Sequence, residues 1–138
     1  MPRVLIADDN ETVRKALRGM FVDAGDEWNV CGEAANGLEA VQLVPKLKPD
    51  VVLLDFQMPV MNGLDAAREI AKNAPSLPIA MYTLHQNTIF EKQAYAVGVR
   101  KVISKSDVFS ALIPSLTALL DGKHPCFEGD AADRGTSC

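Results

Sequence analysis

Five residues with reactive or charged side chains stand at, or directly after, the ends of short apolar runs. They comprise three acids, one hydroxyl and one amine: Asp8, Asp9, Asp55, Thr83 and Lys105. Ligands of an open parallel sheet bind at the carboxyl ends of its strands, so we expect these side chains to meet at one edge. Three carboxylates held together repel one another, and oxygen ligands suit a hard cation such as Mg²⁺. The pattern therefore predicts a divalent-metal site.

Five short apolar runs are predicted to be the strands that position these residues. They cover residues 4–7, 28–32, 51–54, 79–83 and 101–104. The run at 51–54 is Val-Val-Leu-Leu and so is apolar throughout, as a strand covered on both faces requires. We expect it at the centre of the sheet.

The segments between and after these runs show the apolar period of helices. In the first of them, Val13, Leu17 and Phe21 fall on one face. The predicted helices cover residues 13–21, 38–47, 64–74, 86–97 and 108–120. Ser106 and Asp107 are candidate caps for the last helix, and Gly98 suits the end of the fourth. Strands that alternate with helices predict an α/β fold built from five βα units around a parallel sheet.

The composition indicates a globular protein of about one domain, because the chain has 138 residues and is 48% hydrophobic. A net charge of −4 disfavours a general attraction to nucleic acid or to an anionic membrane. The apolar stretches are far shorter than the roughly 20 residues of a spanning helix, and the N-terminus lacks the pattern of a secretory signal. We therefore expect a cytoplasmic protein without a membrane segment.

Two further features concern the cysteines and the end of the chain. Cys31, Cys126 and Cys138 have no close-paired spacing, which favours reduced thiols over a disulfide framework or a zinc site. Hydrophobic periodicity stops after residue 120, and glycine, proline, aspartate and small residues dominate from there. We expect one domain at 1–120 and a flexible tail at 121–138.

The candidate residues belong to an ordered set with a characteristic spacing. Its members are Asp8-Asp9, the stretch Asp-Phe-Gln-Met-Pro at 55–59, Asn62-Gly63, Thr83 and Lys105. This set resembles a response-regulator receiver domain, CheY-like, of two-component signalling, over about residues 3–120. The chain is most similar to receivers that precede a LuxR-type helix-turn-helix domain. The resemblance implies a flavodoxin-like fold with strand order 2-1-3-4-5.

The resemblance also implies a role for each residue of the set. Asp55 would be the phosphoacceptor and would take a phosphoryl group from a histidine kinase or a histidine phosphotransfer protein. Mg²⁺ would be held by Asp9, Asp55 and the backbone carbonyl of Gln57, with Asp8 acting largely through water. The remaining two residues would bind the phosphoryl oxygens, Thr83 as a hydroxyl donor and Lys105 as a point charge.

Three positions matter for how such a site would respond. Many family members have a proline after the site lysine, in a cis peptide, whereas this chain has Ser106, and a cis bond before another residue costs about 2.5–4 kcal/mol. Val102 replaces the aromatic residue of a rotating switch, so no aromatic switch is expected. In the family, residues at the positions of Gln57 and His85 tune the lifetime of the aspartyl phosphate. For His85, the sequence favours this role no more than that of an ordinary loop histidine.

These observations favour a phosphorylation-dependent switch that changes its affinity for a protein partner, and not a turnover enzyme. One alternative is that the chain is the isolated receiver part of a DNA-binding regulator. Its 18-residue tail is too short to hold a helix-turn-helix domain, because independent folding needs about 40 residues or more. Another is a pseudo-receiver that binds partners without phosphorylation. A phosphorylation-dependent homodimer remains open, and we expect no direct binding of nucleic acid by this chain.

A flavin site and a phosphatase on the same fold are disfavoured. Asp8 and Asp9 would repel a phosphate at the place where a flavin protein has a phosphate-binding loop. Gln57 stands where an aspartate-nucleophile phosphatase has its second aspartate.

Overall fold

The computed structural model describes residues 2–24, 28–84 and 88–121, with the backbone alone at position 109. Strands and helices alternate strictly along this part of the chain: β1 (Arg3–Ala7), α1 (Glu11–Asp23), β2 (Asn29–Ala34), α2 (Gly37–Leu47), β3 (Val51–Asp55), α3 (Gly63–Asn73), β4 (Ile79–Thr83), α4 (Thr88–Ala96), β5 (Lys101–Ser104) and α5 (Val108–Leu120). His85 and the tail predicted at 122–138 lie outside the described residues. None of the described helices is both long enough and apolar enough to cross a bilayer.

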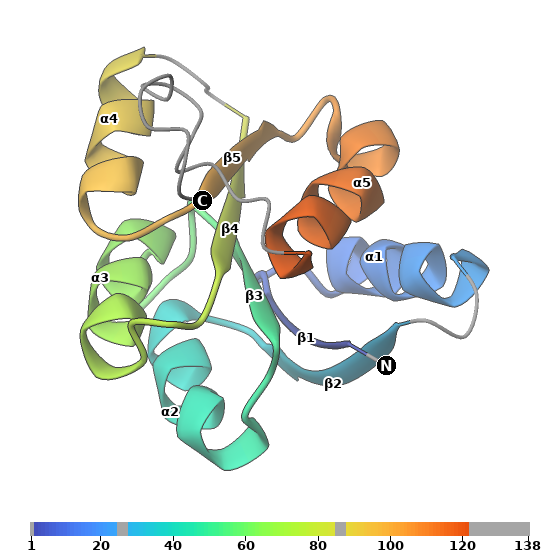
Figure 1. Cartoon of the computed structure of the whole chain (residues 1–138), viewed down its shortest axis with the longest axis horizontal. Helices are drawn as coiled ribbons and strands as arrows, with labels where there is room; N and C mark the ends of the chain where they lie inside the picture. The colour runs from blue at the N-terminus through green and yellow to red at the C-terminus, as the bar shows by residue number, and fades with distance from the viewer. Residues whose placement is uncertain (1, 25–27, 85–87, 122–138) are drawn as a thin grey trace.

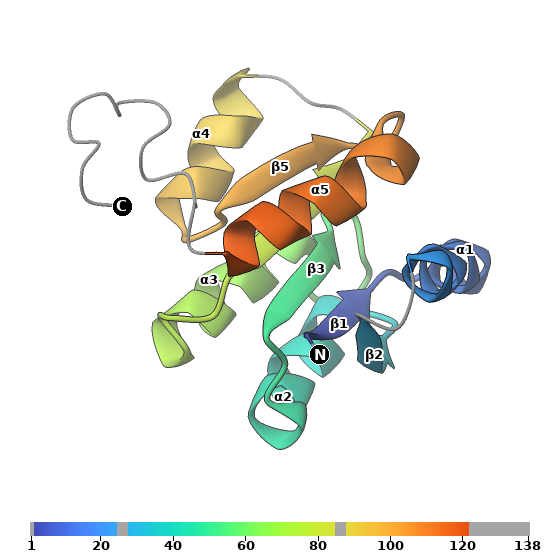
Figure 2. The same cartoon turned by 45° about the vertical axis from the view of Figure 1, so that its right-hand side comes forward.

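The strands form one parallel sheet in the order β2-β1-β3-β4-β5, which confirms the flavodoxin-like α/β prediction. All five residues of β3 are buried, and this strand lies at the centre, as its unbroken apolar sequence predicts. Helices α1 and α5 lie side by side on one face of the sheet, while α2, α3 and α4 cover the other (Figure 1). A turned view shows α5 in front of the sheet, with its axis running roughly along β5 (Figure 2).

The second strand ends later than predicted. It runs to Ala34 because Glu33 and Ala34 pair with Ile6 and Ala7 of β1. A charged residue is tolerated here because β2 is an edge strand and the Glu33 carboxylate forms ion pairs with two arginines of α1. The fourth helix is described from Thr88 to Ala96, inside the range predicted for it.

Asparagine side chains start the first three helices immediately after the carboxyl edge of the sheet. Asn10, Asn36 and Asn62 each accept a hydrogen bond from a backbone N–H in the first turn. Asp107 occupies the same position before α5, but its side chain makes no capping hydrogen bond, which corrects the cap predicted there. The Ser106 hydroxyl instead lies 2.8 Å from the Ser104 hydroxyl. Gly98 has a φ of +115°, a conformation that glycine adopts without strain at the end of a helix.

Candidate metal and phosphoryl-transfer site

Three carboxylates come together at the carboxyl edge of the sheet. Asp8 and Asp9 follow β1, and Asp55 is the last residue of β3, the neighbouring strand. One oxygen from each lies within 4.8 Å of the others. Asp8 and Asp55 are buried, whereas Asp9 is exposed. Carboxylate oxygens are the hard ligands that Mg²⁺ prefers. Because Asp9 is exposed, the site leaves room for the several water ligands that Mg²⁺ keeps beside one or two carboxylates.

Asp55 is held by two donors. The Lys105 ammonium lies 3.0 Å from its Oδ1, and the Gln57 backbone N–H donates to the same oxygen over 3.3 Å. Burial, followed by the charge of Asp8, raises the pKa of Asp55 from 3.8 to about 6, although Lys105 and Gln57 oppose the shift. A cation near these carboxylates would relieve this repulsion and favour the ionised form.

Thr83 and Lys105 reach the same edge from β4 and β5. Thr83 pairs with Ser104 in the sheet, and the Lys105 backbone N–H donates to the Thr83 carbonyl over 2.8 Å. Thr83 is 2% exposed. No peptide bond within the described ranges is cis, so the Lys105–Ser106 bond is trans. The strand pairing thus brings Thr83 to the same edge as the acidic cluster, and the Lys105 ammonium lies beside Asp55.

Asp8 has partners that sequence reasoning missed. Its Oδ1 accepts the Asn10 N–H over 2.8 Å, and its Oδ2 accepts the Tyr82 hydroxyl. Burial, and then the charge of Asp8, raise the pKa of the Tyr82 phenol above its usual value, so the phenol remains the donor. The signal in the sequence was a tyrosine in an otherwise apolar strand, one residue before Thr83.

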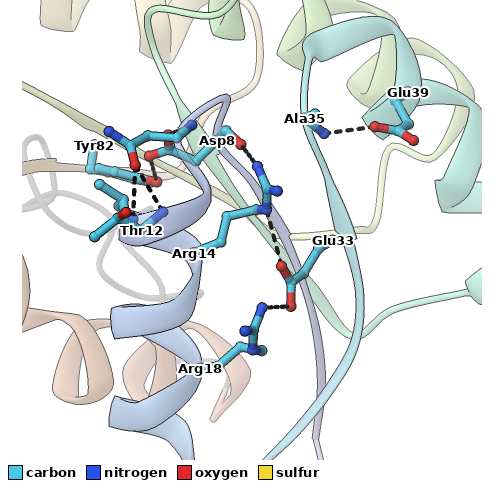
Figure 3. A network of polar contacts seen from close by, with 10 residues as sticks. Asp8, Thr12, Arg14, Arg18, Glu33, Ala35, Glu39 and Tyr82 are labelled. Atoms are coloured by element: carbon cyan, nitrogen blue, oxygen red, sulfur yellow. Dashed lines mark hydrogen bonds and ion pairs between the residues drawn. The ribbon is translucent and has the colours of Figure 1, made fainter.

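The backbone at Asp8 is also anchored. The Arg14 guanidinium donates to the Asp8 carbonyl and, through Nε, to Glu33 over 3.0 Å. Arg18 pairs with the other oxygen of Glu33. Figure 3 shows this chain of contacts from α1 through β2 to the end of β1. These contacts fix the turn from which Asp8 and Asp9 emerge.

Gln57 lies in the loop beside the exposed acid. Together with Asp9, Met58, Pro59 and neighbouring residues it lines a pocket of about 410 Å³. A larger cavity of about 670 Å³ lies at the opposite edge of the sheet, between α2 and α3, and none of the predicted site residues lines it. The larger cavity and the candidate reactive residues therefore lie at opposite ends of the strands. We take the end with the acidic cluster as the candidate functional site, because the reactive side chains are there.

Gly63 brings the start of α3 onto the backbone of Asp55. A Cβ atom at Gly63 would lie 2.3 Å from the Asp55 carbonyl oxygen, and the Gly63 N–H donates to the Phe56 carbonyl over 2.8 Å. In the sequence, Asn62-Gly63 is a pair typical of a turn or a helix start. The structure adds a close approach that no larger residue fits.

Gly63→Ala is expected to destabilise the fold by about 1–3 kcal/mol, the usual cost of overpacking. Gly19→Ala is the matched control, because Gly19 lies inside α1 with nothing within 4 Å of an added Cβ. It is expected to stabilise the fold by about 0.5–1 kcal/mol. Urea unfolding of both variants measures the difference, and effects of the same sign would contradict the close approach at Gly63.

The fold and the acidic edge together define a flavodoxin-like α/β protein with a candidate metal centre. The family of response regulator receiver domains matches residues 4–116. The chemotaxis protein CheY of Thermotoga maritima is 39% identical over 114 residues, which cover 83% of this chain and 93% of that protein. The chain belongs to the response regulator receiver domain family.

Other relatives are longer than this chain. The transcriptional regulatory protein YdfI of Bacillus subtilis is 32% identical over 122 residues, which cover 88% of this chain and 56% of YdfI. A protein-glutamate methylesterase/protein-glutamine glutaminase of Pyrococcus abyssi is 49% identical over 79 residues, which cover 57% of this chain and 21% of that protein. The chain therefore spans about half of the one and about a fifth of the other.

Solved structures show the same relationship. A LuxR-family two-component response regulator from Aurantimonas sp. SI85-9A1 has a TM-score of 0.84 and 27% identity, with 96% of both chains covered. The response regulator domain of Thermotoga maritima CheB has a TM-score of 0.76 and 30% identity, covering 88% of this chain and 95% of that one.

Proposed function

We propose that this chain is a phosphoacceptor receiver that takes a phosphoryl group onto Asp55 with the help of Mg²⁺. The donor is a histidine kinase or a histidine phosphotransfer protein, and the exchange takes place in the cytoplasm. The observation that carries the proposal is the buried Asp55 carboxylate, which lies 3.0 Å from the Lys105 ammonium and within 4.8 Å of two further carboxylates. Three carboxylates so close together repel one another, and a bound cation would relieve that repulsion.

Asp55 acts as the nucleophile. The Lys105 ammonium and the Gln57 N–H both reach Asp55 through Oδ1. A carboxylate oxygen forms a bond to phosphorus as the bond from phosphorus to the donor's imidazole nitrogen breaks, and the electron pair returns to that nitrogen. Mg²⁺ held at this site would supply positive charge that offsets the charge on the transferring group.

The neighbouring residues hold the product. Asp9, Asp55 and the Gln57 carbonyl would hold the metal, while Asp8, whose oxygens accept hydrogen bonds from the Asn10 N–H and the Tyr82 hydroxyl, would act largely through water. Lys105 moves from the free carboxylate to a phosphoryl oxygen, and the Thr83 hydroxyl donates to another. The change of partner at Lys105 and Thr83 gives the phosphorylated state contacts that the free state lacks, which a population shift requires.

The output is a change in affinity for a protein partner through the α4-β5-α5 face, and the chain acts as a switch without a separate substrate. A homodimer formed on phosphorylation is one such output. The described residues of α4 include two exposed apolar side chains, Ile89 at 72% and Tyr95 at 45%. These side chains support a protein contact at this face.

Intact-protein mass spectrometry tests the proposal. Incubation with Mg²⁺ and a small phosphodonor is expected to add one phosphoryl group, with release on mild base because acyl phosphates are labile. Replacement of Mg²⁺ by a chelator is expected to abolish the gain. A protein that stays unmodified under both conditions contradicts the proposal and favours a pseudo-receiver.

A second candidate is the receiver part of a DNA-binding regulator. It is favoured by the similarity to a LuxR-family response regulator with a TM-score of 0.84 and by the alignment with YdfI, of which this chain spans 56%. On this proposal residues 1–120 are the receiver, residues 121–138 lead toward an output domain, and the described residues themselves bind no nucleic acid. The phosphorylation chemistry is the same in both cases.

A further inference from the structure

Tyr82 touches both halves of the candidate site. It stands on β4 directly before Thr83 and opposite Asp55 in the pairing of β3 with β4. Its side chain is 1% exposed, and its ring packs in the core between the sheet and α1 and α5. A phenol placed so deeply needs a partner for its hydroxyl.

The hydroxyl finds this partner in the acidic cluster. It donates to Asp8 Oδ2, although the two residues are 74 positions apart and β3 lies between their strands. Figure 3 shows the two side chains in contact at the end of β1. A hydrogen bond to a carboxylate beside a metal fixes the orientation of that carboxylate.

The ring faces the other half of the site. The Lys105 ammonium, which pairs with Asp55, lies 5.3 Å from the centre of the Tyr82 ring. This distance is within the range of a cation–π contact. One side chain thus contacts a carboxylate of the metal half and the lysine of the phosphoryl half.

We propose that Tyr82 is a positioning residue that ties the two halves together, its hydroxyl orienting Asp8 for the metal and its ring seating Lys105 for the phosphoryl group. This inference rests on the proposed function for its second half. Its first half concerns the affinity for Mg²⁺ alone and can be measured without any phosphorylation.

Tyr82→Phe separates the two contacts, because it keeps the ring and removes the hydroxyl. Loss of a hydrogen bond to a direct metal ligand typically weakens metal binding by about 10–100-fold. Because Asp8 would act largely through water, we expect the low end of this range, with the Mg²⁺ dissociation constant rising by about 10-fold. Isothermal calorimetry or NMR shift titration measures it. The Mg²⁺ concentration for half-maximal phosphorylation is expected to rise equally, with the maximal rate at saturating Mg²⁺ within about twofold of wild type.

Two controls bracket this result. Tyr95→Phe makes the same chemical change at the only other tyrosine, in the last turn of α4 and away from the acidic edge, and is expected to leave the dissociation constant unchanged. Asp9→Ala removes a carboxylate of the cluster and is expected to weaken Mg²⁺ binding at least as much as Tyr82→Phe. Tyr82→Leu removes hydroxyl and ring, and is expected to lower the maximal rate as well.

Equal Mg²⁺ dissociation constants for wild type and Tyr82→Phe would overturn the role of the hydroxyl. Equal maximal rates for Tyr82→Phe and Tyr82→Leu at saturating Mg²⁺ would overturn the role of the ring. A wild type that binds Mg²⁺ but is never phosphorylated would remove the proposed function and the role of the ring, and would leave the calorimetric comparison intact. A purely structural role would lower the melting temperature of Tyr82→Phe without moving the Mg²⁺ dissociation constant, and this result also counts against the inference.

Discussion

Asp55→Asn is expected to abolish phosphorylation and, at the same time, to make the protein more stable at neutral pH in the absence of Mg²⁺. The loss follows because an amide is not a nucleophile for phosphoryl transfer. The gain follows because the charged carboxylate is buried close to Asp8, which the raised pKa of Asp55, about 6, reflects. An asparagine of nearly the same shape carries no charge to bury.

The pH dependence gives the sign of this effect. The pKa of Asp55 is 3.8 when unperturbed and about 6 in the folded protein, so between these values the folded state binds more protons than the unfolded state. Wild-type stability therefore falls as pH rises through this window, by roughly 2–3 kcal/mol from this group. Asp55→Asn is expected to be more stable at pH 7.5, and the difference is expected to vanish toward pH 4.

Urea unfolding at pH 7.5 and pH 4, with a chelator present, measures the change in stability. Intact-protein mass spectrometry after treatment with a phosphodonor measures the loss of phosphorylation. Asp23→Asn is the matched control, since Asp23 is exposed at the end of α1. It is expected to be phosphorylated like wild type and to lack the pH-dependent gain. A phosphoryl group retained by Asp55→Asn would move the acceptor elsewhere, and a variant less stable than wild type at pH 7.5 would refute the electrostatic account.

Thr83→Ala is expected to keep phosphorylation and to lose most of the conformational response. The substitution removes the hydroxyl that would bind a phosphoryl oxygen and leaves the carboxylates intact. Val102 lies buried in β5 at 4% exposure, where the family often has an aromatic switch. The response is therefore expected to run through the backbone after Thr83 into α4, helped by Phe56, which packs edge-on against Phe90 with ring centres 4.6 Å apart.

Hydrogen exchange with and without beryllofluoride, an aspartyl-phosphate mimic, measures this response in α4 and in the segment from β5 to α5. Wild type is expected to change its protection there, and Thr83→Ala to lose most of that change while still binding the mimic. Thr12→Ala is the matched control, because Thr12 is an exposed threonine at the same edge of the sheet. Unchanged protection in wild type with the mimic bound, or an undiminished change in Thr83→Ala, would contradict the proposed coupling.

The sequence alone predicted the order of the strands and helices, and the edge of the sheet at which the reactive side chains lie. Apolar runs and helical periods depend on which side chains are buried, so they predicted five strands, five helices and the central place of β3. The carboxyl ends of parallel strands meet at one edge of the sheet, so the sequence also predicted that Asp8, Asp9 and Asp55 lie together, as they do. Local chemistry also marked a helix start at Asn62-Gly63, because a cap requires only neighbours in sequence.

Only the tertiary structure decided the contacts that link distant parts of the chain. The bond from Tyr82 to Asp8, the approach of Gly63 to Asp55, and the ion pairs that let β2 continue through Glu33 each depend on how strands and helices are placed relative to one another. Periodicity specifies which face of an element is buried and leaves open which side chain it meets across the sheet. The resemblance already implied that β1, β3 and β4 are neighbours, but only the packed sheet shows that a hydroxyl 74 positions away in the chain reaches Asp8 across β3.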